Sequence, residues 1–229
     1  MNDALEKTLD EDVFAHLHAS SALGAPLRHM HMRSGWLALL AIAGAGLFCW
    51  LAIWVVSGDS LTLDIAILRM VGDYRALPLK SLALLLSRLV VTSSVLILVY
   101  LLYRRWWRIA LFWFCSSAGV GVLASLAKKA AQRHRPELWT TVSSHATFSF
   151  PSGHATQSMA IVVALMLIVP PRWRLNVLAG SAVFVCLVGA CRLYLGMHYP
   201  TDILAGWVLS IGWVSLLALL FGVGVAHRR

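Results

Sequence analysis

Long apolar runs separated by short polar connections dominate the pattern of this sequence. They cover residues 35–56, 80–103, 107–131, 151–169, 173–193 and 202–225. Each run is close to the ~20 residues that a helix needs to cross a bilayer, and backbone groups in lipid must find their hydrogen bonds within a helix. The pattern predicts an all-α polytopic membrane protein. Residues 34–229 would form a bundle of six transmembrane helices, and residues 1–33 a polar cytoplasmic tail.

The composition agrees with a membrane protein. Of the 229 residues, 59% are hydrophobic and 13% are charged, whereas a soluble domain is typically about 45–50% apolar and about 25% charged. The net charge of +9 could indicate a nucleic-acid partner, but the arginines flank apolar runs, where membrane topology explains them better. The four cysteines show neither paired nor metal-ligand spacing, so we expect no disulfide and no zinc site.

The basic residues between the apolar runs predict the orientation of the bundle. They form four groups that all fall on one side of a six-helix arrangement: Arg28 and Arg33; Arg104, Arg105 and Arg108; Arg172 and Arg174; Arg228 and Arg229. The positive-inside rule makes that side, with both termini, cytoplasmic. The outer side receives the loops 57–79, 132–150 and 194–201. The first of these mixes leucine and isoleucine with charged residues, and could be an amphipathic element in the interface.

A short polar stretch, Pro151-Ser152-Gly153-His154, opens the fourth run on the outer side. Pro151 suits the first position of a helix. The backbone N–H groups of Ser152 and Gly153 would then lie at an open helix N-terminus, which attracts phosphate. His154 adds a side chain that gives or takes a proton near neutral pH. The simpler alternative is a polar helix cap with a chance histidine.

Two cations mark the outer end of the third run. Lys128 and Arg135 are seven residues apart, so they share one helix face, and Pro136 disfavours helix at Arg135. The alternative is that both cations snorkel to the interface, which is the interpretation that we give to Lys129 and Arg133.

A third group lies between the fifth and sixth runs. Arg192 is followed by His198 and then, four residues later, by Asp202. Pro200 suits the first turn of the sixth helix. A carboxylate at this spacing could accept the histidine Nδ1–H and leave Nε2 as an oriented lone pair. Such a pair alone is as often structural as catalytic. The outer ends of four predicted helices nevertheless hold two histidines, a carboxylate and three cations. Ionisable groups at membrane depth are costly and tend to be functional, so these residues predict a single functional site.

Taken together, Lys128-x6-Arg135-Pro136, Pro151-Ser152-Gly153-His154 and Arg192-x5-His198-x3-Asp202 resemble the three-part signature of the type-2 phosphatidic acid phosphatase superfamily. The match spans residues 128–202. The third motif of that family usually begins with serine, where this chain has Cys191. A thiol is a weaker hydrogen-bonding group, so Cys191 is left out of the site. The superfamily also contains soluble vanadium haloperoxidases, and six apolar runs argue against that branch.

The resemblance implies a role for each residue. His198 would attack phosphorus, Asp202 would hold its tautomer, and His154 would protonate the leaving oxygen and then activate water. The phosphoryl oxygens would be held without a metal or other cofactor by Lys128, Arg135, Arg192 and the N–H groups of Ser152 and Gly153. Gln157 and Ser158 share a face with His154 and would either orient it or pack polar groups between helices; packing is slightly favoured.

The implied substrate is a lipid phosphate or diphosphate whose head group reaches the outer site while its tails stay in the bilayer. The resemblance is to bacterial inner-membrane members. Undecaprenyl diphosphate is favoured because an outward-facing site suits carrier-lipid recycling. Phosphatidylglycerol phosphate, phosphatidic acid and lipid A phosphates remain alternatives. A non-catalytic lipid-phosphate binder or transporter is the alternative of another class, although binding alone needs no nucleophile. The sequence leaves the oligomeric state open.

Overall fold

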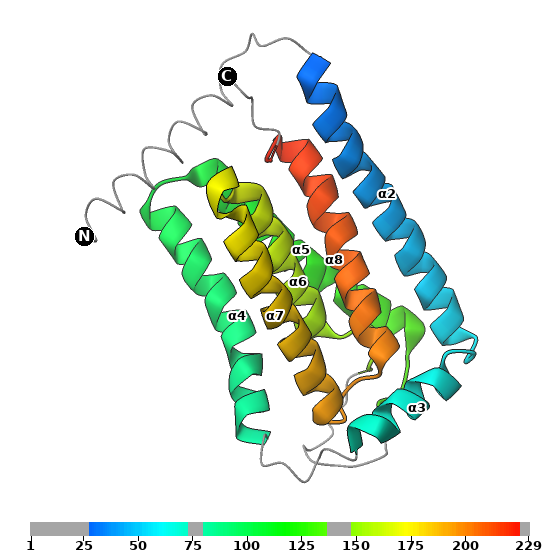
Figure 1. The fold of residues 1–229 in the computed structure, drawn as a ribbon. Coiled ribbons are helices and arrows are strands. Elements are labelled where there is room, and N and C mark those ends of the chain that lie inside the picture. The colour runs from blue at the N-terminus through cyan, green and yellow to red at the C-terminus, as the bar shows by residue number, and fades with distance from the viewer. Residues whose placement is uncertain (1–27, 73–79, 137–147, 225–229) are drawn as a thin grey trace.

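The structure is a computed structural model that describes residues 28–72, 80–136 and 148–224. The described chain is helical throughout and contains no strand. Its elements are α2 (Arg28–Val56), α3 (Leu61–Gly72), α4 (Lys80–Tyr103), α5 (Trp107–Ala131), α6 (Gly153–Ile168), the 3₁₀ turn η1 (Pro171–Trp173), α7 (Arg174–Tyr194) and α8 (Pro200–Phe221). The long helices form an elongated bundle, and the short helix α3 lies across one end of it (Figure 1).

Five helices in the described part of the chain are long and apolar enough to cross a membrane: Ser34–Val56, Lys80–Tyr103, Trp107–Ala131, Pro171–Tyr194 and Pro200–Phe221. Their outward surface is apolar, and on α4 the side chains of Leu85, Val95 and Leu96 are more than half exposed. Such a surface is suited to lipid rather than to water.

The fourth predicted span is shorter than expected. Helix α6 has 16 residues, which extend about 24 Å at 1.5 Å per residue, whereas the hydrocarbon core is about 30 Å thick. The helix begins at Gly153 and not, as predicted, at Pro151; Ser152 is its N-cap. Six spans therefore remain a prediction. Pro200, by contrast, does begin α8 as expected.

Helix α8 is the centre of the bundle and contacts α2, α5 and α6. Glycines permit the closest of these contacts. A Cβ built on Gly44 of α2 would lie 2.6 Å from the Gly212 Cα, and one built on Gly206 would lie 2.6 Å from the Thr156 Oγ1 on α6. These positions have no room for a side chain, so the small residues let the helix backbones touch. The contact between Gly206 and Thr156 holds the start of α8 beside the start of α6.

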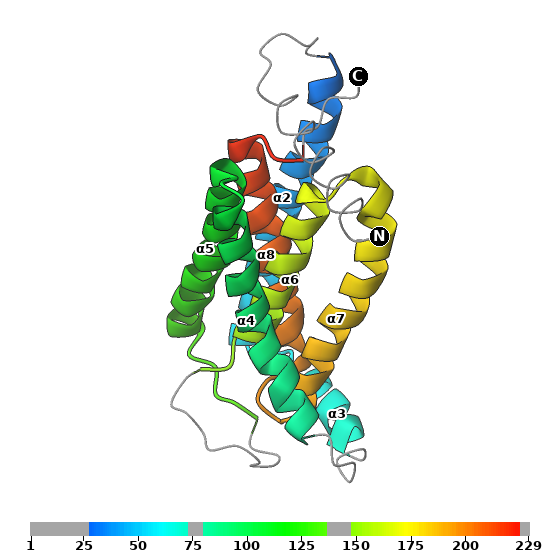
Figure 2. The same ribbon diagram turned by 90° about the vertical axis from the view of Figure 1, so that its left-hand side faces the viewer.

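The two ends of the bundle differ in character. One end of the bundle holds the α4–α5 and α6–α7 connections, with the arginine groups at 104–108 and 172–174. The other end holds α3 and the starts of α6 and α8 (Figures 1 and 2). The tail 1–27 and the terminal arginines fall outside the described residues. The sequence predicts an amphipathic element within residues 57–79, and the described part of this segment forms the helix α3. It is docked on the bundle, because its Asp64 and Leu68 are fully buried.

Candidate active site

The three sequence motifs meet at the end of the bundle that carries α3. Lys128 stands in the last turn of α5, with Arg135 shortly beyond it. His154 follows the first residue of α6. Arg192 lies in the last turn of α7 and Asp202 in the first turn of α8, with His198 in the connection between them. Helix ends from four segments thus bring the predicted residues together.

His198 is 3% exposed, and its contacts define its tautomer. Its Nδ1 lies 2.9 Å from the Ser149 carbonyl oxygen and 3.5 Å from Asp202 Oδ2. Both oxygens only accept hydrogen bonds, so the proton resides on Nδ1 and Nε2 carries the lone pair. That lone pair faces the Arg135 guanidinium, whose Nη1 is 3.5 Å away. The sequence predicted the Asp202 partner but not the nearer Ser149 carbonyl.

Burial keeps His198 neutral. Desolvation lowers the pKa of the His198 imidazole to about 4, although the Asp202 carboxylate acts in the opposite direction; Arg135 and Lys128 lower it further. The pKa of Arg135 is also lowered, again chiefly by burial. A neutral imidazole with an oriented lone pair is the form in which histidine acts as a nucleophile or base.

The three predicted cations are held differently. The Lys128 Nζ donates to the carbonyl oxygens of Phe148 (2.8 Å) and Ser149 (3.3 Å), and Arg135 donates to the Met197 carbonyl at 2.7 Å. Arg192 is 2% exposed, and its Nη1 has only the Met197 sulfur at 3.7 Å. The Nε and Nη2 atoms of Arg192 are buried without a hydrogen-bond partner. A buried charge with unused donors is costly, so this side chain is the clearest sign of an anion site.

The structure corrects one expected contact. The Ser152 backbone N–H donates to the Asp202 carbonyl oxygen at 3.0 Å, so it is engaged inside the protein and not open to a phosphate. The Ser152 hydroxyl, in contrast, is buried without a partner. Gly153 is exposed, and a Cβ built on it would meet nothing within 4 Å. The space in front of the first turn of α6 is therefore open.

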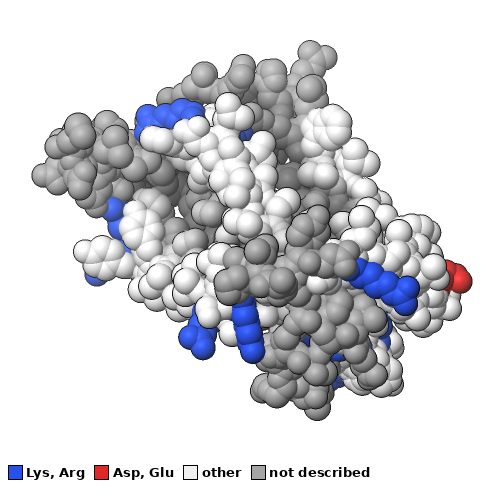
Figure 3. Space-filling view, turned by 60° about the horizontal axis from the view of Figure 1, so that its bottom comes forward, with Lys and Arg blue, Asp and Glu red and all other residues white. Residues whose placement is uncertain are grey.

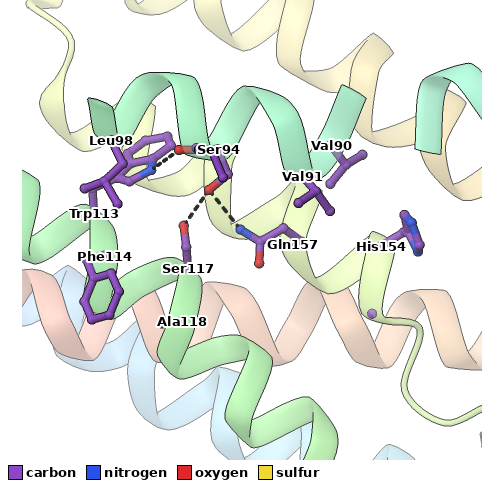
Figure 4. Close-up of a pocket in the computed structure, with 12 residues that line it drawn as sticks. Val90, Val91, Ser94, Leu98, Trp113, Phe114, Ser117, Ala118, His154 and Gln157 are labelled. Carbon is purple, nitrogen blue, oxygen red and sulfur yellow. Dashed lines mark hydrogen bonds between the residues drawn. The ribbon is translucent and has the colours of Figure 1, made fainter. Parts of the chain in front are cut away.

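A cavity of about 440 Å³ runs from His154 between α4, α5 and α6. Figure 4 shows His154 at one end of it and the rings of Trp113 and Phe114 toward the other. The lining is mostly apolar. Gln157 donates to the Ser94 hydroxyl on α4 at 3.2 Å, and Ser158 bonds to the Ala155 carbonyl of its own helix. Gln157 thus joins polar groups of two helices, as the sequence slightly favoured, whereas Ser158 bonds within its own helix.

Sequence reasoning missed two charged residues of the site. Arg133, predicted to snorkel, has a side chain only 10% exposed and forms ion pairs with Asp64 at 2.5 Å and Asp202 at 2.6 Å. Asp64 belongs to the segment expected to be an amphipathic element in the interface, yet it is 0% exposed. One signal could have found it. Asp64 and Leu68 share a helix face, and a carboxylate on an apolar face suggests burial with a partner.

More basic than acidic side chains are visible on the face of the molecule at this end of the bundle (Figure 3). Viewed from this end, lysine and arginine side chains appear at several places among the described residues, whereas an acidic patch appears only at one margin (Figure 3). The carboxylates of Asp64 and Asp202 are fully buried and do not offset this charge at the surface. Within the described residues, no group of three or more histidine, cysteine or acidic side chains is arranged to hold a metal ion.

One end of this bundle of apolar helices thus holds a buried neutral histidine, a second histidine at a helix start and three cations. Cations and histidines in such an arrangement could bind an anionic group and move protons. The chain contains a PAP2 superfamily domain over residues 110–223.

Curated relatives match part of the chain. The chain is 38% identical over 128 residues to a lipid A 1-phosphatase of Rhizobium etli, a match that covers 52% of each protein. It is 37% identical over 73 residues to an undecaprenyl-diphosphatase of Sulfolobus acidocaldarius, covering 31% of this chain and 32% of the relative. The chain thus aligns with about half the length, or less, of these curated relatives.

The fold resembles the crystal structure of a transmembrane PAP2-type phosphatidylglycerolphosphate phosphatase from Bacillus subtilis. The TM-score is 0.67 at 26% identity, and the match covers 77% of this chain and 93% of that one.

Proposed function

We propose that this protein is a membrane-embedded phosphatase that hydrolyses a lipid phosphate or diphosphate through a phosphohistidine at His198. The observation that carries the proposal is the combination of the His198 Nε2 lone pair, which faces the Arg135 guanidinium, with the Nε and Nη2 of buried Arg192, which have no hydrogen-bond partner. A phosphoryl group offers an electrophilic phosphorus to the first and anionic oxygens to the second.

The reaction has two displacements. The His198 Nε2 attacks phosphorus while the bond from phosphorus to the lipid oxygen breaks, and His154 gives that oxygen its proton. Water then attacks the phosphohistidine and loses its proton to His154. The phosphorus–nitrogen bond breaks, inorganic phosphate leaves, and His198 returns to its neutral state. Asp202 stabilises the positive charge that the imidazole carries in between.

Charge on the transferred group is stabilised by Lys128, Arg135 and Arg192, so the proposed mechanism needs no metal. The Ser152 hydroxyl and the Gly153 N–H are further donors at the start of α6. Because the Ser152 hydroxyl is buried without a partner, it takes the place that the sequence assigned to the Ser152 N–H.

The membrane setting suits a lipid substrate. The apolar cavity that leads from His154 suits a hydrocarbon chain, while the phosphate lies among the cations. We propose that α6 completes a six-helix bundle, that the arginine-rich end and both termini are cytoplasmic, and that the site faces the outer water interface of a bacterial inner membrane.

Two substrates are the main candidates. The longer and more similar match to a lipid A 1-phosphatase supports a phosphorylated, acylated sugar. The shorter match to an undecaprenyl-diphosphatase supports undecaprenyl diphosphate, which the sequence favoured on grounds of sidedness. The comparisons favour the lipid A phosphate. Because the fold resembles that of a phosphatidylglycerolphosphate phosphatase, phosphatidylglycerol phosphate is a third substrate to be tested.

The test is phosphate release by purified protein from lipid A 1-phosphate, undecaprenyl diphosphate, phosphatidylglycerol phosphate and phosphatidic acid, compared by kcat/KM. Rapid quenching in alkali, in which the phosphorus–nitrogen bond of a phosphohistidine survives, should find phosphate on the wild-type protein and on His154→Ala, but not on His198→Ala. Phosphate trapped on His198→Ala but not on His154→Ala would reverse the two roles. Binding of these lipids without release of phosphate would indicate a binder or transporter instead.

A further inference from the structure

Arg133 lies between two buried carboxylates that come from different helices. Its Nη2 contacts Asp64 Oδ2 on α3 at 2.5 Å, and its Nη1 contacts Asp202 Oδ1 on α8 at 2.6 Å. The guanidinium also stacks on the Tyr199 ring, 4.0 Å from its centroid. Asp64 and Asp202 are both 0% exposed. Arginine offers a planar fork of donors, so it can hold two acceptors in fixed directions.

Asp64 is fixed from a second side. Its Oδ1 accepts the Thr201 backbone N–H at 3.0 Å, and its Oδ2 accepts the Thr201 hydroxyl at 2.6 Å. The Thr201 oxygen in turn accepts a hydrogen bond from Arg133 Nη1 at 2.8 Å. The N–H belongs to the first turn of α8, where backbone donors lack intrahelical partners and a carboxylate is stabilising. Helix α3 therefore supplies a cap to α8 from outside that helix.

The two oxygens of Asp202 are used separately. Oδ1 accepts from Arg133, while Oδ2 accepts the Tyr199 backbone N–H at 2.9 Å and faces His198 Nδ1 at 3.5 Å. With one oxygen held by the guanidinium and the other by the amide, the carboxylate cannot rotate. Its second oxygen stays directed at the imidazole.

The charges also fit this arrangement. Two carboxylates and one guanidinium carry a net charge of −1 when all three are ionised. A buried net charge is costly unless a partner compensates it. The imidazole of His198 becomes positive when its Nε2 bonds to phosphorus, and at that moment the cluster is neutralised. The positive charge of Arg133 helps to hold Asp202 in its ionised form, so removal of Arg133 would make that carboxylate easier to protonate.

We propose that Arg133, held by Asp64, is a positioning residue that sets the orientation and the ionised state of Asp202, and through it the reactivity of His198. This inference rests on the proposed function, because it assumes that His198 is the nucleophile. It makes α3 part of the catalytic framework although α3 contributes no group to the phosphate. A purely structural tie between α3 and α8 is the competing explanation.

A double-mutant cycle separates the two explanations. Arg133→Gln should lower kcat by about 10- to 100-fold, which is typical when a group that orients a reactive side chain is removed. KM should stay within about twofold, because the phosphate-binding cations are untouched. In the Asp202→Asn background, Arg133→Gln should have almost no further effect on kcat, because the residue through which it acts is already impaired. Asp64→Asn should also lower kcat, but by less than Arg133→Gln.

The controls use the same segment of the chain. Lys129→Gln removes an exposed positive charge four residues earlier and should leave kcat unchanged. Arg133→Lys keeps the charge but not the fork, so it should lose less than Arg133→Gln, and it tests the proposal if the glutamine variant does not fold. Melting temperature in detergent is recorded for each variant.

Equal losses of kcat for Arg133→Gln in the wild-type and Asp202→Asn backgrounds would overturn the inference, as would a change confined to KM. Those results, obtained with an enzyme that still forms phosphohistidine at His198, would leave the proposed function intact. Absence of the phosphoenzyme in the wild-type protein would overturn both.

Discussion

The candidate site contains two largely buried arginines, Arg192 and Arg133, whose hydrogen-bond donors are used differently. On the phosphate side, Arg192 is 2% exposed and keeps two buried nitrogen atoms without a partner. On the opposite side of His198, Arg133 meets Asp64, Asp202, Thr201 and the Tyr199 ring. Buried hydrogen-bond donors without a partner indicate a ligand site, whereas a side chain whose donors are all paired is held in a fixed position.

The difference predicts that substitutions on both sides lower activity, but that only those on the paired side also lower stability. A buried ion pair that loses one partner costs about 3–5 kcal/mol of folding free energy. A buried charge that has no partner in the empty protein already carries its desolvation cost, so its removal relieves the folded state. Substitutions on the phosphate side should therefore reduce turnover without unfolding the protein, and those on the paired side should affect both.

The largest effect is expected for His154, which faces the open start of α6. His154→Ala should lower kcat by about 10²–10⁴-fold on an alkyl phosphate lipid, because the leaving oxygen loses its proton donor. The loss should be much smaller on a nitrophenyl ester, whose leaving oxygen needs little protonation. The measurement is kcat for both substrates with wild-type protein and variant. An equal loss on both would show that His154 does not act as the acid.

Arg192→Gln tests the phosphate side of the comparison directly. It should lower kcat/KM by about 10²–10³-fold, as for loss of one donor to a developing anion, while the melting temperature in detergent stays equal or rises. Arg133→Gln, measured in parallel, should lower the melting temperature by several degrees. If Arg192→Gln destabilised the protein as strongly as Arg133→Gln, the contrast between unused and paired donors would be wrong.

Much of this arrangement could be read from the sequence, and the exceptions have a common cause. The apolar runs predicted the long helices because a bilayer dictates both length and polarity, and the motif spacings predicted that Lys128, His154 and His198 lie near one another. The pairing of Arg133 with Asp64 could not be read, because the two residues are far apart in sequence and meet only when α3 docks on α8. The same holds for the Ser152 N–H, which the Asp202 carbonyl occupies.

The pH dependence of stability sharpens the description of His198, which lies between the two sides. Its folded-state pKa is about 4, below the ordinary value of about 6.5, so the unfolded chain binds the proton more readily between these values. Stability is then fully present above about pH 6.5 and falls as the pH drops toward 4. Between pH 7 and pH 5 the contribution is about 2 kcal/mol.

This contribution is isolated by comparing variants. The drop in melting temperature from pH 7 to pH 5 should be smaller in His198→Gln than in the wild-type protein. The exposed His134, which lies in the same region, supplies the control, and His134→Gln should keep the wild-type drop. An unchanged drop in His198→Gln would show that the imidazole is not held neutral by burial.

The smallest expected effect concerns metal removal, and here the prediction is no change. The phosphate side holds three cations, and Arg192 has unused donors, so the charge of the transferred group is balanced by the protein itself. Activity should therefore survive EDTA, and added Mg²⁺ should not raise kcat. The measurement is phosphate release by protein dialysed against EDTA, with Arg192→Gln as the comparison. If EDTA abolished activity and Mg²⁺ restored it, a metal would supply the positive charge that we attribute to Arg192 and the other two cations. The unused donors would then need another explanation.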